Sequence, residues 1–422
     1  MMQNKTVHDF INIALLSGGW MELDRLYLNN QIIALIGPTD DEETETLEES
    51  TKTSRDLLNE LMEIAKSNQK VDSHDLKSIN ELEAKLMALL TPPPSVVNAL
   101  FSQHYDATEK EATDYFYLMN LTNDSIDENT LLKKEVEINR QPFIIQAKQD
   151  TSKELMSSVC SYCFESEGYG IEKNANKRII RMNLRGDSWG FYYVSNPLLK
   201  EHCIYTPETH EPLVMNRQLQ ETMLNLVDIY PHYFVSVNPE VLRLAPHGHL
   251  YGGDAKIPLA LAENSFMFDI PGFVTVEASI VDWPISVIRL KTTSKKNLIN
   301  AMEYITLKWQ QYSYPSLDII AKDEDGKDLH SMIPVMRKED NYYIVDMILQ
   351  DNSSEFKPTL AYQNLITEEA WPIDQLGIIN LKSNQELTDE TIEKVTKSME
   401  KQSIFRRPQD GQKAFLRFID TL

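Results

Sequence analysis

Positive charge is scarce in this chain. Its 422 residues include 41 Lys and Arg against 64 Asp and Glu, which gives a formal net charge of −23. A broad nucleic-acid surface needs a basic field that displaces phosphate counterions, so we expect no nucleic-acid partner. A small anionic substrate is still compatible, because a local site can be positive on an acidic protein. Residues 176–185 carry four basic side chains and are one candidate, although a half-exposed strand with solvated charges explains them too.

Long apolar runs are also missing. No stretch approaches the roughly 20 apolar residues that are needed to span a bilayer. Residues 7–20 are apolar, but Asp9 and Asn12 interrupt them. This segment also lacks the basic start and the small-residue cleavage site of a signal peptide. We therefore expect neither a membrane partner nor a secreted protein.

Cysteine is rare, with three residues in the chain. Three cysteines cannot build a disulfide framework, so a reducing compartment fits best and we expect a cytoplasmic protein. Cys160 and Cys163 form a C-x-x-C motif. Two thiolates at this spacing can bind one zinc ion, but the spacing also suits a redox pair or no special role. Redox pairs usually open a helix after a strand, whereas residues 160–170 read as a loop.

The chain has nine histidines, and two of them, His247 and His249, stand one residue apart between a Pro and a Gly pair. In extended backbone, residues i and i+2 face the same side, about 6.5–7 Å apart. One imidazole could then bind a metal while the other, in its neutral form, attacks phosphorus. A polar surface strand or a Gly-rich turn accounts for the same spacing. His202 and His210 are further candidates for the remaining zinc ligands.

Hydrophobic periodicity predicts an α+β protein. Residues 5 to about 90 read as helices, with apolar stripes such as Val7, Phe10, Ile11, Ala14 and Leu15. We expect the Pro-rich segment 91–95 to end this helical block, since proline cannot continue a helix. From about residue 134 alternating patterns predict strands.

Helical patterns at residues 216–231 and 294–313 lie between these predicted strands, and the tail is expected to form a helix capped by Thr388. The resulting strand-helix groups, about 155–270 and 271–385, suggest two related halves, although no internal sequence repeat is evident.

Many segments, taken in order, give the chain a resemblance to the second class of bacterial galactose-1-phosphate (hexose-1-phosphate) uridylyltransferases, of the histidine-triad superfamily. The resemblance covers most of the chain. It runs through residues 22–37, 91–105, 160–170, 177–193, 201–215, 228–240, 246–254 and 281–291.

This resemblance implies a helical region over residues 1–125, two histidine-triad-like halves over 126–270 and 271–385, and a helical tail over 386–422. It also implies a ping-pong exchange of UMP between UDP-glucose and galactose-1-phosphate. The partners would be a UDP-sugar and a hexose-1-phosphate, and a homodimer is a further expectation.

The resemblance assigns residue roles as well. The second histidine of the family's His-x-His motif is the nucleophile, which corresponds to His249. The first histidine, both cysteines and a histidine between the two motifs bind structural zinc in members that carry the site. The corresponding ligands are Cys160, Cys163, His210 and His247. His210 fits better than His202, because residues 208–213 resemble the turn that carries the family's histidine.

Several positions depart from the family pattern. Tyr251 replaces a glutamine that steadies the uridylyl phosphate, whereas Asn238 matches an asparagine near the nucleotide and Asp374 stands where the family has a sugar-binding glutamate. A Gly-Gly-Ser stretch is missing from residues 238–247. An Arg-His-Glu-Phe run becomes residues 254–257, and a histidine pair followed by lysines is replaced within residues 361–367.

These substitutions alter the phosphate-holding groups but leave the nucleophile and the zinc set in place. Three readings follow. The chain is a uridylyltransferase, a non-catalytic relative that binds a sugar phosphate or nucleotide, or a hydrolase in which water resolves the histidine intermediate.

Overall fold

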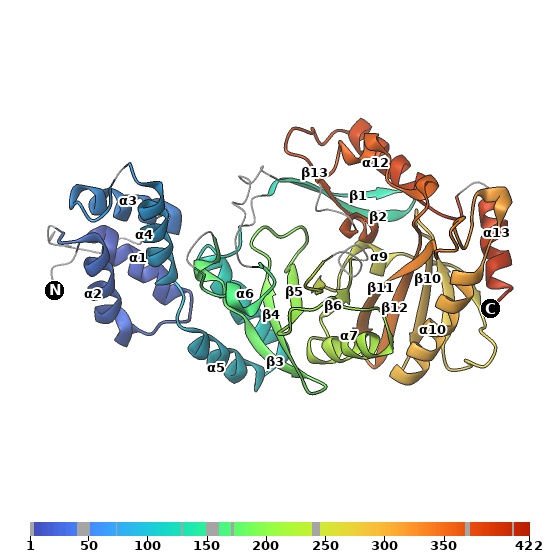
Figure 1. Ribbon diagram of the computed structural model, residues 1–422, viewed down its shortest axis with the longest axis horizontal. Coiled ribbons are helices and arrows are strands. Elements are labelled where there is room, and N and C mark those ends of the chain that lie inside the picture. Colours follow the sequence, from blue (N-terminus) through green and yellow to red (C-terminus); the bar gives the residue numbers. More distant parts are fainter. Residues whose placement is uncertain are drawn as a thin grey trace. The chain divides into compact units, whose positions relative to one another are not determined.

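The computed structural model describes residues 4–39, 51–72, 74–127, 130–148, 160–169, 173–238, 245–367, 372–406 and 409–422 (Figure 1). Two compact units make up the chain. The first comprises Met1–Glu128, Ser152–Pro197 and Cys203–His210, and the second comprises Asn129–Thr151, Leu198–His202 and Glu211–Leu422. Within the described residues, no helix is long and apolar enough to cross a membrane.

The first unit begins with helices, as predicted. They are α1 (Lys5–Leu16), α2 (Arg25–Ile36), α3 (Ser54–Ser67), α4 (Leu76–Ala88), α5 (Pro94–Tyr105) and α6 (Glu109–Thr122). The apolar stripe of α1 is buried from Val7 to Ala14 and packs in a core with α2, α3 and α4. The side chains of Asn4 and Thr53 accept hydrogen bonds from the first turns of α1 and α3, which fixes where these helices start.

The prediction that residues 91–95 end the helical block was wrong. Pro94 is the first residue of α5, and helices continue to Thr122. Proline is tolerated at a helix's first position, because the N–H that it lacks has no partner within the helix there. The Pro-rich segment therefore separates two helices without closing the block.

Three antiparallel strands complete the first unit. They are β3 (Ile180–Leu184), β4 (Asp187–Tyr193) and β5 (Cys203–Pro207), in that order across the sheet. Two short 3₁₀ helices, Phe164–Ser166 and Lys173–Asn176, precede them. Phe101 and Phe116 of α5 and α6 pack edge to face and also contact Phe191 of β4, so aromatic rings join these helices to the sheet.

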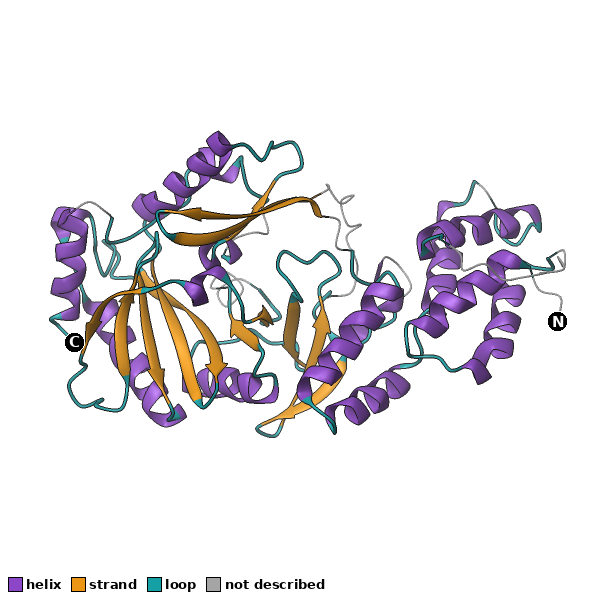
Figure 2. Ribbon diagram, turned by 180° about the vertical axis from the view of Figure 1, so that it is seen from behind, coloured by secondary structure: helices purple, strands orange, loops and turns teal. Residues whose placement is uncertain are grey.

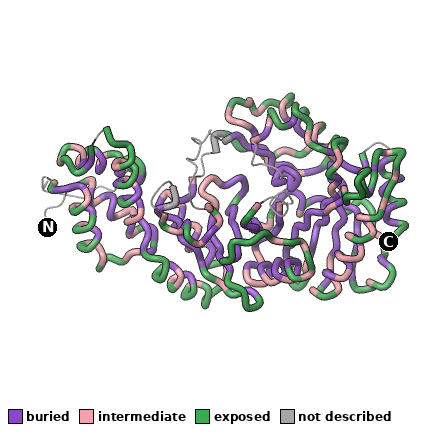
Figure 3. The backbone as a smooth tube through the Cα atoms, in the orientation of Figure 1, coloured by how far each residue is buried: buried purple, intermediate pink, exposed green. Residues whose placement is uncertain are grey.

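The second unit contains a large antiparallel sheet with the strand order β7-β6-β11-β12-β10-β9-β8. Its strands are β6 (Tyr233–Ser236), β7 (Leu250–Asp254), β8 (Asn264–Phe268), β9 (Glu277–Val281), β10 (Val287–Thr292), β11 (His330–Glu339) and β12 (Tyr342–Asp351). Helices α7 (Arg217–Ile229) and α10 (Lys295–Gln311) contact each other and both contact β11, so they cover one face of the sheet (Figure 2). The central strands are buried over most of their length (Figure 3).

A smaller sheet in the second unit joins distant parts of the sequence. The hairpin β1 (Thr130–Ile138) and β2 (Gln141–Lys148) is extended by β13 (Ile378–Leu381), which runs parallel to β2. The remaining helices of this unit are α9 (Pro258–Leu261), α11 (Leu360–Gln363), α12 (Asp389–Lys401) and α13 (Gln409–Ile419), with 3₁₀ turns at Pro315–Leu317, Ser354–Phe356 and Ile373–Leu376. Thr388 caps α12, as predicted.

The predicted α+β class is confirmed. One order of elements, three strands, a helix and two strands, occurs twice: first as β3, β4, β5, α7, β6, β7, and again as β8, β9, β10, α10, β11, β12. No repeat evident in the sequence predicted this recurring order of strands and helix.

A buried ionic cluster links three strands of the large sheet. The Asp346 carboxylate on β12 accepts hydrogen bonds from Arg289 on β10 (2.6 Å) and Arg337 on β11 (2.5 Å). Arg289 also donates to the carbonyls of Ala262 and Leu259. Because the carboxylate is fully buried, it is the counter-charge that both guanidinium groups share inside the sheet, and Arg337 also pairs with the exposed Glu339 (3.2 Å).

Asp346→Ala should therefore lower the free energy of unfolding by about 3–5 kcal/mol, since both guanidinium groups lose their buried counter-charge. Chemical denaturation measures the change. Asp328→Ala is the matched control, because its ion pair with Lys322 is on the surface and should contribute less than about 1 kcal/mol. Equal losses for the two variants would contradict a stabilising role for the cluster.

Candidate functional site

The C-x-x-C motif lies in a tight turn. The Cys163 amide donates to the Cys160 carbonyl (3.1 Å), and the Ser166 amide donates to the Cys163 carbonyl (3.1 Å). Cys163 directly precedes the 3₁₀ turn Phe164–Ser166, and the described residues from there to β3 contain no α-helix. The turn therefore differs from a redox pair, whose second cysteine usually lies in the first turn of an α-helix.

Lys177 supports this turn from within the same unit. Its buried ammonium group donates to the Ser161 carbonyl (2.6 Å) and to the Ser166 hydroxyl (2.8 Å), and it lies 3.6 Å from the centre of the Tyr192 ring. Burial lowers the pKa of Lys177 to about 7, while nearby Glu167 acts in the opposite direction. The sequence identified Lys177 only as one of the four basic residues in 176–185, so its structural role was not predicted.

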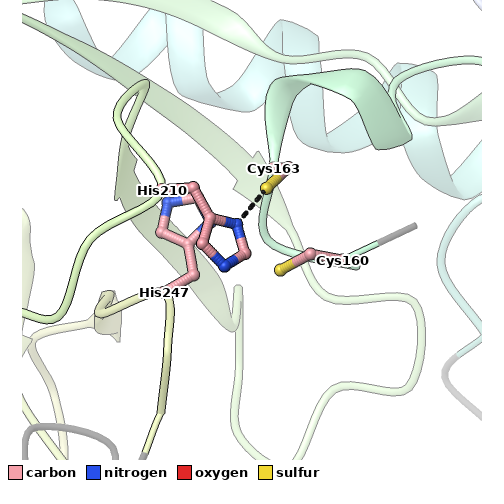
Figure 4. A group of neighbouring side chains, drawn as sticks. All are labelled: Cys160, Cys163, His210 and His247. Carbon is pink, nitrogen blue, oxygen red and sulfur yellow. Dashed lines mark hydrogen bonds between the residues drawn. The ribbon is translucent and has the colours of Figure 1, made fainter. Parts of the chain in front are cut away.

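Four predicted metal ligands come together. Cys160, Cys163, His210 and His247 each offer one ligand atom, and these atoms all lie within 4.8 Å of one another. Figure 4 shows the two sulfur atoms and the two imidazole rings turned toward a common point. The shortest approach joins the Cys163 sulfur and His210 Nδ1 at 2.9 Å.

The donor set of this cluster fits a metal ion. Two thiolates and two imidazoles are a common ligand set of structural zinc sites. Burial, together with the neighbouring Cys160 thiol, raises the pKa of the Cys163 thiol to about 12. A divalent cation would overcome this rise in the thiol pKa, because metal-bound thiols are deprotonated. The four side chains could therefore hold a metal.

His202 does not join this group. Its Nδ1 accepts a hydrogen bond from the Leu198 amide (3.3 Å), and its ring meets Tyr251 edge to face. The choice of His210 over His202, made because residues 208–213 resemble the family's turn, agrees with the cluster.

The backbone around Gly248 brings the two histidines into position. Its amide donates to the Glu211 carbonyl (2.9 Å). A Cβ atom at residue 248 would lie only 2.3 Å from the Leu213 amide nitrogen. Because no other residue fits this approach, the glycine lets the His-x-His segment run against the chain that follows His210.

His249 is buried at the start of β7. Its Nδ1 lies 3.5 Å from the His247 carbonyl oxygen, a long contact that favours a proton on Nδ1 and the lone pair on Nε2. Burial lowers the pKa of His249 to about 4. The ring therefore has the neutral form that a nucleophile requires.

Tyr251 lies on β7, two residues beyond His249, opposite Ser236 of β6. Its hydroxyl is buried and has no hydrogen-bonding partner among the described residues. Burial raises the pKa of Tyr251 and the nearby Ser236 hydroxyl partly offsets this rise, but the two hydroxyl groups do not meet hydrogen-bond geometry, and Ser236 donates to the Pro334 carbonyl (2.9 Å). A buried hydroxyl without a partner is costly in a folded protein, so Tyr251 has a donor available for a ligand.

Asp374 belongs to the same neighbourhood, because the pKa of Tyr251 is raised mainly by burial and in addition by the Asp374 charge. It is fully buried and accepts a hydrogen bond from the Tyr362 hydroxyl (2.5 Å) and from the Gln375 amide (2.9 Å). Burial raises the pKa of Asp374 to about 6. Gly377, at φ +87°, closes the turn by donating its amide to the Asp374 carbonyl. Sequence reasoning missed Tyr362, because nothing in its local pattern links it to Asp374.

Asn238, the predicted nucleotide contact, is half-buried two residues after β6. The shortened segment 238–247, which lacks the family's small residues, lies partly outside the described residues, since these resume at Ala245.

No family model matches the sequence. The chain is 27% identical to a galactose-1-phosphate uridylyltransferase of Enterococcus faecalis, over 99% of this chain and 98% of that protein. It is 31% identical to galactose-1-phosphate uridylyltransferase 2 of Streptococcus pneumoniae serotype 4, over 88% and 80% respectively. It is 33% identical to a galactose-1-phosphate uridylyltransferase of Pediococcus pentosaceus, over 85% of this chain and 78% of that protein.

Among solved structures, yeast Ap4A phosphorylase Apa2 matches 71% of this chain and 96% of that chain, with a TM-score of 0.44 and 12% identity. The sequence matches confirm the family that the motifs predicted. At more than 30% identity over most of both proteins, the chain belongs to the galactose-1-phosphate uridylyltransferase family.

Proposed function

We propose that the chain exchanges UMP between UDP-glucose and galactose-1-phosphate through a uridylyl group on His249. The observation that carries this proposal is the place of His249, which is buried two residues after His247 of the Cys-His cluster, with Nδ1 facing a carbonyl. Family membership supports the substrate assignment, since the relatives from Enterococcus and Streptococcus share a name that specifies galactose-1-phosphate and uridylyl transfer.

The exchange takes two steps, each of which forms one bond to phosphorus and breaks another. In the first, the Nε2 lone pair of His249 attacks the α-phosphorus of UDP-glucose. The bond from this phosphorus to the bridging oxygen breaks, and glucose-1-phosphate leaves with the electron pair. In the second, a phosphate oxygen of galactose-1-phosphate attacks the same phosphorus, the phosphorus–nitrogen bond breaks, and UDP-galactose leaves while His249 is regenerated.

Tyr251 is proposed to steady the phosphoryl oxygens during both steps. Its buried hydroxyl can donate a hydrogen bond, and such donors act most strongly where they meet charge that develops in the transition state. Asn238 and Asp374 are proposed to contact the nucleotide and the sugar. The Asp374 carboxylate is already held by Tyr362, so a sugar would have to share it.

The metal is proposed to be a structural zinc ion held by Cys160, Cys163, His210 and His247. When bound, zinc would fix the backbone that presents His249, because the ligand His247 lies two residues away. Lys177 would add to this by holding the cysteine turn.

Cys160→Ser should reduce zinc from about one ion per chain to near zero, because three ligands bind far more weakly than four. Elemental analysis of purified protein measures the metal and separates zinc from iron. Cys203→Ser and His202→Ala are matched controls outside the cluster and should keep the metal. Loss of metal from His202→Ala, with retention in a His210→Ala variant, would contradict the ligand set.

His249→Ala should abolish the covalent adduct that forms with labelled UDP-glucose, a decrease of at least about a thousandfold, while zinc content and folding stay nearly unchanged. Mass spectrometry of the intact protein detects the adduct. His74→Ala, at an exposed histidine, is the control and should behave as wild type.

Two further results would decide between the readings of the sequence. Release of UMP in water alone, without transfer to galactose-1-phosphate, would indicate a hydrolase. Absence of any adduct in wild type, with unchanged UDP-glucose binding in His249→Ala, would show that the nucleophile assignment is wrong and favour a binding protein.

Tyr251→Phe should separate function from stability. Removing a buried hydroxyl without a partner should leave the free energy of unfolding unchanged or raise it by up to about 1 kcal/mol. The rate of adduct formation should fall by about a hundredfold if this hydroxyl stabilises the transition state. Thermal unfolding and rapid-quench kinetics measure the two quantities. An unchanged rate would exclude Tyr251 from the chemistry.

A further inference from the structure

Two aromatic rings flank the ring of Tyr251. The ring centre of His202 lies 6.2 Å from that of Tyr251, with the planes at 85°, and the ring centre of Phe234 lies 6.0 Å away, with the planes at 82°. Both are edge-to-face contacts, which have a preferred geometry. Because the Tyr251 hydroxyl is buried with no hydrogen-bonding partner among the described residues, these ring contacts decide where it points.

The imidazole ring of His202 is itself held by the backbone. The side chain is buried, and its Nδ1 accepts a hydrogen bond from the Leu198 amide (3.3 Å). An acceptor at Nδ1 leaves the proton of the neutral ring on Nε2. Turning the ring away from Tyr251 would break the bond to Leu198, so this bond keeps the ring in its edge-to-face contact.

The backbone directly before His202 is strained. Glu201 is buried and has φ +56°, in the left-handed region that residues other than glycine rarely adopt. Such conformations cost free energy, persist only where surrounding contacts determine them, and cluster at functional sites. One such contact is the hydrogen bond that the Glu201 carboxylate accepts from the Tyr233 hydroxyl at the start of β6 (2.7 Å).

The same turn is anchored to β7, the strand that carries Tyr251. The Lys200 ammonium group pairs with the Asp254 carboxylate (2.6 Å), and the Asp254 amide donates to the Lys200 carbonyl (3.1 Å). Asp254 is the last residue of β7, and His249 directly precedes this strand. The turn at 198–202 is therefore fixed relative to the strand that presents both Tyr251 and the proposed nucleophile.

We infer that His202 is a positioning residue of the proposed reaction, and that its ring holds Tyr251 so that the tyrosine hydroxyl meets the phosphoryl oxygens. The inference rests on the proposed function, in which Tyr251 is the donor. It gives a role to a histidine that the Cys-His cluster leaves out. Because this donor depends on ring packing for its place, a small displacement matters: about 1 Å can lower a rate a hundredfold.

A double-mutant cycle tests the inference. His202→Ala should slow the formation of the uridylyl adduct about tenfold, while the half-saturating concentration of UDP-glucose stays unchanged, since the donor acts in the transition state. In a Tyr251→Phe background the same change should have no further effect, because the hydroxyl that His202 positions is already absent. Rapid-quench kinetics over a range of UDP-glucose concentrations measures both quantities.

Three further variants make the cycle decisive. His202→Phe keeps an aromatic ring and should restore most of the rate. His202→Gln can still accept from the Leu198 amide but has no ring, so it should be as slow as His202→Ala and replaces that variant if alanine prevents folding. His104→Ala is the matched control, because it removes an imidazole that stacks on Tyr115 in the first unit (4.5 Å), and it should react as wild type.

Two kinetic results would overturn the inference. Losses that multiply in the double variant would show that His202 and Tyr251 act independently. A His202→Phe variant as slow as His202→Ala would assign the effect to the ring nitrogens and not to the ring contact.

A fluorine NMR signal tests the ring contact without the chemistry. In protein made with 3-fluorotyrosine, the Tyr251 signal is the one that Tyr251→Phe removes. This signal should shift in His202→Gln, which lacks the neighbouring ring, and should not shift in His104→Ala. An unchanged signal in His202→Gln would overturn the inference. If wild type forms no adduct but the signal shifts, the proposed function fails while the placement of Tyr251 by His202 stands.

Discussion

The contact between Gly248 and residues 211–213 is the constraint on which the candidate site depends. One hydrogen bond to the Glu211 carbonyl and a 2.3 Å limit to the Leu213 amide leave no room for a side chain at residue 248. The same contact fixes the backbone between the buried His247 and His249, and Leu213 also lines a cavity of the second unit. A larger residue at position 248 would therefore disturb the histidines and the cavity together.

Buried charged groups have charged partners in the large sheet, but Asp374 beside Tyr251 does not. In the large sheet, Asp346 is paired with Arg289 and Arg337, so the buried charges compensate one another. Near Tyr251, Asp374 is buried with neutral donors only, and burial raises its pKa to about 6. The sheet thus uses buried charge for structure, whereas the site keeps a carboxyl group whose ionisation is costly. Perturbed groups of this kind tend to cluster at functional sites.

Tyr251 departs from the glutamine of the family pattern, and its surroundings explain why this change matters. A tyrosine in this position could have been bonded to the sheet, in which case it would be part of the core. Instead its hydroxyl is buried with no partner among the described residues. Tyr251 therefore brings a buried hydroxyl to this position.

Local patterns in the sequence determined much of this protein. The stripe from Val7 to Ala14, the cap at Thr388 and the alternation from residue 134 each reflect neighbouring residues, and they predicted helices and strands correctly. The metal ligands were predicted through resemblance to a family, and the structure brings them within 4.8 Å. The pairing of β13 with β2, the Tyr362–Asp374 bond and the cavity beside Leu213 were decided only by tertiary structure. Each joins residues far apart in the chain, and spacing along a sequence carries no record of which distant side chains meet when the core packs.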